Sequence, residues 1–260
     1  MAETRHGRRN VLVVLGVGLA AGLLSGFFGV GGGTVIVPAL VLLGFTQRRA
    51  VATSLAAIVP TAIAAAVAYV VHGHVDWPVA GLIVVGVVTG ARVGSSLLSR
   101  LSERTLRWAF AGFLVLTAVS QFVFVPQREA EIPLDVGRGV AVVALGVVTG
   151  VLSGVLGLGG GLVVVPALTV LFGASDLVAR GTSLVMMIPG AATGTWSNFR
   201  KGGLVDFKAA ALIGGAAIAM TPLGNLAAGA LPPRANSVLF GCYIAALFVR
   251  SAIVARRKDK

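Results

Sequence analysis

Two stretches of this sequence, 128 positions apart, are nearly identical. GLLSGFFGVGGGTVIVPAL (Gly22–Leu40) aligns with GVLSGVLGLGGGLVVVPAL (Gly150–Leu168), and 13 of the 19 aligned residues are the same. The glycines and prolines match as well as the aliphatic residues, so this is more than the general likeness of two apolar segments. The chain is therefore built from two homologous halves, and any fold proposed for one half must also serve the other.

The alignment continues past this motif after a one-residue insertion, so that Thr53-Ser54 aligns with Thr182-Ser183. Between the halves lies PQREAEIPLD, which is polar and carries a proline near each end. Polar segments of this kind are typical of linkers. We therefore predict an N-terminal half over residues 1–125, a linker over 126–135 and a C-terminal half over 136–260.

The composition assigns both halves to a lipid bilayer. Hydrophobic residues make up 57% of the chain and charged residues only 12%, about half the charged share of an average soluble domain. A membrane-spanning helix needs about 20 mostly apolar residues. Eight stretches are near this length: Val11–Phe28, Ala50–Val71, Pro78–Leu98, Leu106–Val125, Val136–Leu156, Leu177–Phe199, Phe207–Ala230 and Ala235–Val254. Two shorter apolar stretches, Thr34–Leu43 and Leu162–Phe172, reach about halfway across as helices.

The sequence thus predicts an all-α polytopic membrane protein, with four full spans and one half-helix in each half. The net charge of +12 comes from Lys and Arg at the chain ends and in short loops. Basic loops beside apolar spans are typical of cytoplasmic ends, so we predict no nucleic-acid partner.

The two halves are either parallel or inverted, depending on whether each short stretch returns or completes a crossing. With a cytoplasmic N-terminus and Arg92 left out, inversion places sixteen Lys and Arg residues inside, whereas the parallel arrangement places thirteen there. Because positive residues favour the cytoplasmic side, we predict inverted halves with both termini cytoplasmic, in the cell (plasma or inner) membrane. Four basic residues are then outside: Arg128, Arg138, Arg180 and Arg234.

The glycine runs Gly29–Gly33 and Gly157–Gly161 are predicted to be unwound and to reach the middle of the membrane. A half-helix follows each run, with Pro38 and Pro166 expected in the first turns, where a missing N–H costs least. A helix N-terminus presents free N–H groups and the positive end of its dipole, so two such ends would bind an anion. The alternative is that the glycines only let helices pack closely. We prefer that interpretation for the glycines spaced by four: Gly22, Gly26, Gly150 and Gly154.

The doubled GxxSGxxGxGGGxxxVPAL motif, followed each time by Ala-x-x-Thr-Ser-Leu, resembles the sulfite exporter TauE/SafE family, also called the toluene-sulfonate uptake permease family. The resemblance covers nearly the whole chain. It implies a polytopic transporter of small sulfur-containing anions, such as sulfite, sulfonates or sulfoacetate-like compounds. The halves differ where Val51-Ala52 aligns with Arg180-Gly181, so the site need not be symmetric.

The candidate substrate-binding residues lie at the glycine runs or are polar within a span. They are Gly31, Gly32, Gly33, Thr34, Thr53, Ser54, Arg92, Gly159, Gly160, Gly161, Leu162, Thr182 and Ser183. The hydroxyl groups could donate to an oxyanion or bond back to their own helix. Arg92 is the one Lys or Arg well inside a predicted span, so it either contacts substrate or extends its charge to the interface.

Acidic residues and histidines are scattered in the sequence, so we expect neither an enzyme nor a metal or other cofactor. No carboxylate is predicted in mid-span, and coupling to protons or sodium is left open, as is a homo-oligomer. The preferred function is a secondary transporter that works by alternating access between inverted halves. The alternatives are a passive anion channel and a transporter of another small organic anion.

Overall fold

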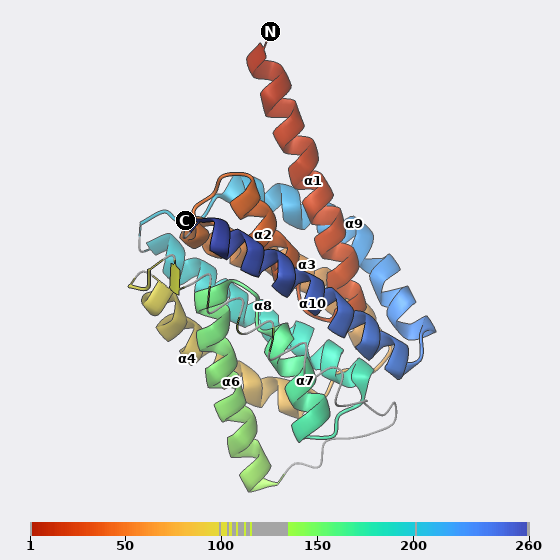
Figure 1. The fold of residues 1–260 in the computed structure, drawn as a ribbon. Coiled ribbons are helices and arrows are strands. Elements are labelled where there is room, and N and C mark those ends of the chain that lie inside the picture. Colours follow the sequence, from red (N-terminus) through yellow and green to blue (C-terminus); the bar gives the residue numbers. More distant parts are fainter. Residues whose placement is uncertain are drawn as a thin grey trace.

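The computed structural model describes residues 2–98, 100–102, 104–105, 108, 112, 115, 135–200 and 202–258. The regular elements in these ranges are all α-helices, as predicted (Figure 1). They are α1 (Ala2–Phe28), α2 (Gly33–Leu42), α3 (Gln47–Val71), α4 (Trp77–Leu98), α6 (Val136–Leu156), α7 (Gly161–Leu171), α8 (Asp176–Arg200), α9 (Phe207–Ala230) and α10 (Pro233–Lys258). The predicted linker, apart from Asp135, and most of the predicted span Leu106–Val125 lie outside the described residues.

Five of the described helices are long and apolar enough to cross a membrane. They are the apolar part of α1 (Val11–Phe28), α3, α4, α6 and α9, and each overlaps a predicted span. Helix α8 is as long as α3, with 25 residues, but it is less apolar and is not one of these five helices. The apolar part of α10 is shorter, covering Arg234–Val249. The crossings predicted for α8 and α10 therefore stay predictions.

Both short apolar stretches form short helices that start at the last glycine of each run. Helix α2 has 10 residues and α7 has 11, close to the predicted bounds. Pro38 and Pro166 lie in the interior of these helices. The expectation that they occupy the first turns is wrong, because each helix begins at the final glycine and places its proline in the second turn.

Two seams of small residues hold the helices of one half against those of the other. Helix α4 packs along α6, and a Cβ atom on Gly150 would lie 2.8 Å from the backbone nitrogen of Ala91. Helix α1 packs along α9 in the same way, and a Cβ on Gly224 would lie 3.1 Å from the Cα of Gly26. Contacts this close need glycine on the facing surfaces, as expected for helices associating in lipid.

Helices α3 and α8, which are repeat equivalents, pack against each other in the centre and run in opposite directions. Gly181, near the start of α8, lies against Tyr69, near the end of α3. Gly194, near the end of α8, lies against Leu55, near the start of α3. The equivalent helices α1 and α6 also enter from opposite ends of the molecule (Figure 1).

Candidate functional site

Each glycine run breaks the helix between a long span and the following half-helix. Gly29, Gly31 and Gly32 have φ of 71°, 69° and 74°, and their equivalents Gly157, Gly159 and Gly160 have φ of 71°, 75° and 98°. Side-chain-bearing residues rarely adopt these left-handed conformations. Gly32 and Gly160 are the N-caps of α2 and α7, and neither receives a side-chain cap bond. The first N–H groups of both half-helices therefore lack intrahelical acceptors.

The two glycine runs contact each other directly. A Cβ atom on Gly33 would lie 2.7 Å from the carbonyl oxygen of Gly157, and one on Gly161 would lie 2.6 Å from that of Gly29. The Cε of Met187 fills the space next to both Gly31 and Gly159. The start of each half-helix is thus packed against the unwound run of the other half, and all these glycines are buried.

The paired serines cross from one half to the other. Ser54 Oγ donates to the carbonyl oxygen of Gly157 at 2.9 Å, and Ser183 Oγ donates to that of Gly29 at 3.2 Å. Both serines are fully buried. The two serines therefore hold the unwound backbone of the opposite half.

The neighbouring threonines make a second pair of equivalent contacts. Thr53 Oγ1 accepts from the backbone N–H of Asp206, and Thr182 Oγ1 accepts from that of Asp76, both at 3.0 Å. The two aspartates cap the helices that follow them, since each carboxylate accepts an N–H three residues later, at 3.0 Å. Thr53 therefore ties α3 to the start of α9, and Thr182 ties α8 to the start of α4. Each contact joins the two halves.

The two half-helix starts differ chemically. Thr34 Oγ1 lies 2.8 Å from the hydroxyl of Tyr243 in α10, whereas its equivalent Leu162 is apolar and fully buried. Beside Gly160, however, α6 places Thr149 and Ser153, whose buried hydroxyls have no hydrogen-bond partner among the described residues. Each half-helix start thus has hydroxyl groups close by, although they come from different helices.

Arg92 is a candidate that the structure does not bring to the glycine runs. It is exposed on α4, where it lines a surface pocket with Val93, Ser96, Leu97 and Arg100. This placement agrees with the alternative in which the side chain extends towards the interface.

Arg180 was predicted to lie on the outer side, near the start of the span Leu177–Phe199, and it is only 4% exposed. A Cβ on Gly29 would lie 2.7 Å from its Cβ, and its Nη1 donates to the carbonyl oxygen of Phe27 at 2.7 Å. The sequence did indicate that Arg180 is unusual, because it aligns with Val51 in a region where the two halves otherwise match. Its burial next to the glycine run could not be read from the one-dimensional pattern.

Comparison with known proteins identifies the family. The model of the sulfite exporter TauE/SafE family matches residues 1–120 and 142–260, which together make up most of the chain. The chain belongs to the sulfite exporter TauE/SafE family. Members of the TauE/SafE family are membrane transporters, so this TauE/SafE chain is a transporter and not an enzyme.

Curated relatives agree with the TauE/SafE assignment. The probable membrane transporter protein YunE of Bacillus subtilis is 29% identical over 230 residues, which cover 79% of this chain and 84% of YunE. The probable membrane transporter protein YdhB of the same organism is 32% identical over 38% of this chain and 44% of its own length. A probable membrane transporter protein of Haemophilus influenzae is 29% identical over 61% of this chain and 62% of its own. No solved structure matches the chain.

Proposed function

We propose that this protein is a secondary transporter of small sulfur-containing anions, such as sulfite, sulfonates or sulfoacetate-like compounds. The observation that carries the proposal is the meeting of two glycine-capped half-helix starts in the buried centre. Helix N-termini favour anions through their free N–H groups and dipoles. A site made of backbone suits a membrane protein, because it binds negative charge without placing many charged side chains at depth.

The binding residues in this proposal are the sequence candidates other than Arg92. The glycine runs and the residues after them supply N–H groups, and Thr34, Ser54 and Ser183 supply hydroxyls beside the runs. Thr53 and Thr182 add a hydroxyl towards each end of the substrate path. Thr149 and Ser153 add two donors beside Gly160 that need no existing bond to be broken. The substrate would replace Met187 between the two runs, since its Cε now occupies that space.

We further propose that the halves at residues 1–125 and 136–260 are inverted repeats. The antiparallel packing of α3 and α8 supports this, since equivalent helices of parallel repeats would run the same way. Equivalent pairs such as Ser54–Gly157 and Ser183–Gly29 also exchange roles between the halves, as a two-fold relation requires.

Alternating access would then use the two threonine contacts as gates. The Thr53–Asp206 contact lies at the end where Arg49 and Asp206 form an ion pair of 2.9 Å. The Thr182–Asp76 contact lies at the opposite end, next to the loop with His74. Both contacts are formed here, and we assign this conformation to the state that is closed at both ends. Opening one contact at a time would expose the centre to one side only.

The end with Arg49 is the proposed cytoplasmic side. It also carries Arg48, Arg200 and Lys208, as the positive-inside rule expects for cytoplasmic loops. Both chain ends lie towards this side (Figure 1), which supports cytoplasmic termini in a plasma or inner membrane.

Proteoliposomes containing the purified protein test the proposed function. We expect saturable flux of at least one of sulfite, sulfoacetate and taurine, stimulated by the same anion on the opposite side. Flux that neither saturates nor shows this stimulation would indicate a passive channel. A folded preparation that transports acetate or succinate but none of the three sulfur compounds would indicate another small organic anion as substrate.

A further inference from the structure

A buried ion pair of the second half lies beside the first glycine run, and the first half places no equivalent pair beside the second run. Arg180 and Asp176 of α8 have side chains only 5% and 2% exposed. The repeat partner of Arg180 is Val51, which occupies the equivalent place against Gly157. An intramembrane charge is costly and needs compensation, so a charge in one half alone calls for an explanation specific to that half.

The compensation of this pair is incomplete. Arg180 Nη2 lies 3.8 Å from Asp176 Oδ2, which is longer than a hydrogen bond. Both carboxylate oxygens of Asp176 lack a hydrogen-bond partner among the described residues. Arg180 Nη1 donates a charge-assisted bond to the Phe27 carbonyl, and a guanidinium has five N–H donors in all. The pair therefore leaves donor capacity on Arg180 that an oxyanion could use.

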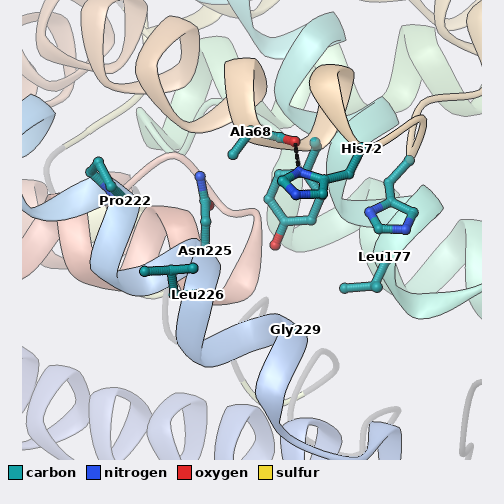
Figure 2. A pocket seen from close by; sticks show the side chains of 9 residues that line it. Ala68, His72, Leu177, Pro222, Asn225, Leu226 and Gly229 are labelled. Carbon is teal, nitrogen blue, oxygen red and sulfur yellow. Dashed lines mark hydrogen bonds between the residues drawn. The ribbon is translucent and has the colours of Figure 1, made fainter.

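A pocket of about 450 Å³ lies at the end opposite to Arg49, and residues next to this pair line it. Tyr69 and Leu177 line it. Tyr69 also lies beside Arg180, because the Tyr69 hydroxyl donates to the carbonyl of Gly26 and the Arg180 guanidinium donates to that of Phe27, the next residue. Asn225 of α9 and His72 at the end of α3 face the same space (Figure 2). Cavities of this size hold small organic molecules.

We infer that Arg180 is the anion-selecting residue on the outer side of the glycine runs. An incoming oxyanion passes through the cavity between α3, α8 and α9, and replaces Asp176 as the partner of the guanidinium. Arginine matches the geometry of an oxyanion with two oxygens better than an ammonium does. Asp176 balances the charge of Arg180 when no substrate is bound. This inference rests on the proposed function. It names Arg180 as the residue by which the two halves contribute differently to the site.

The test measures anion affinity of the purified full chain by calorimetry, with sulfite, sulfoacetate and acetate as probes. Arg180→Gln is expected to weaken binding about 10- to 100-fold, the loss typical of a hydrogen bond to a charged group. Arg180→Lys keeps the charge and is expected to recover part of the affinity. Asp176→Asn removes the competing carboxylate and is expected to tighten binding several-fold.

Two further variants separate recognition from stability. Arg48 also donates to a backbone carbonyl, that of Leu101, at 2.7 Å, but it lies at the opposite end of the molecule. Arg48→Gln is therefore expected to leave the anion affinity unchanged. The neutral double variant Arg180→Gln/Asp176→Asn avoids an unpaired buried carboxylate if the single variant does not fold. Weakened binding in the double variant supports the inference.

Each outcome separates this inference from the proposed function. One outcome would overturn this inference and leave the proposed function standing. In it, wild type and the Arg180 variants bind sulfite or sulfoacetate equally well, and only the melting temperature of the variants is lowered. Arg180 would then only stabilise the end of α1, through its bond to the Phe27 carbonyl. Acetate bound in an Arg180-dependent way, without binding of either sulfur anion, would overturn the substrate class and keep the inference. A folded wild type that binds none of the probes would overturn both.

Discussion

At the scale of single residues, the site depends on backbone conformations that only glycine adopts easily. Gly32 and Gly160 end the unwound runs at φ of 74° and 98° and directly precede the half-helices. A side chain there would be strained and would also collide, since a Cβ on Gly160 would lie 2.5 Å from Cγ2 of Thr149. Close packing and the unusual backbone are therefore both required at these positions.

Gly32→Val and Gly160→Val are expected to abolish transport, because left-handed backbone costs a β-branched residue more than about 1–2 kcal/mol. The measurement is proteoliposome flux at matched amounts of membrane-inserted protein. Gly44→Ala is the control, since Gly44 also has a left-handed φ of 94° but nothing within 4 Å of its added Cβ. Transport by both valine variants at the wild-type rate would contradict the proposed backbone site.

At the scale of helices, the seams of small residues hold α4 against α6 and α1 against α9, so each seam joins the two halves. Gly150→Leu is expected to lower the melting temperature strongly, because its side chain would enter the backbone of α4 near Ala91. Overpacking of this kind costs about 1–3 kcal/mol or more. Gly81→Ala in the same helix pair meets open space and is expected to be neutral or slightly stabilising. Equal melting temperatures for the two variants would contradict the seam.

The threonine contacts lead to a prediction about opening. Thr182→Val is expected to increase access from the outer side, and Thr53→Val from the inner side, because each removes the acceptor of one cross-half bond. The measurement is thiol labelling, in a Cys242→Ser background, of Ala68→Cys in the outer cavity and Ala211→Cys in the pocket beside Phe207.

Thr89→Val is the matched control for opening, since the Thr89 hydroxyl donates to carbonyls of its own helix, at 2.7 and 3.2 Å, and to no other described residue. It should change neither labelling rate. The gate assignment would be wrong if Thr182→Val and Thr53→Val raised labelling at the same site.

At the scale of the whole molecule, inversion predicts where equivalent loops lie. Gly44 and Gly173 follow the two half-helices, and a Cβ on either would meet nothing within 4 Å. With inverted halves, Gly44→Cys should be labelled from the cytoplasmic side and Gly173→Cys from the outside, in intact cells with a membrane-impermeant reagent. Labelling of both from one side would establish parallel halves instead.

Much of the architecture follows from the sequence alone. The 128-residue repeat, the composition and the spacing of the glycines predict helical halves, most of the helix bounds and the two breaks. The physical reason is that these features are local, since helix length follows from apolar runs and left-handed backbone requires glycine wherever it occurs. The family resemblance carried by the same motifs was confirmed by the family match.

Only the tertiary structure decided which polar groups face the centre. Ser54 and Ser183 hold the opposite glycine run, Arg180 is buried and Arg92 is exposed. In a membrane protein both the lipid-facing and the core-facing sides of a helix are apolar, so hydropathy along the chain does not distinguish them. The side on which a residue lies is set by the helix that packs against it, and those partners come from the other half of the chain.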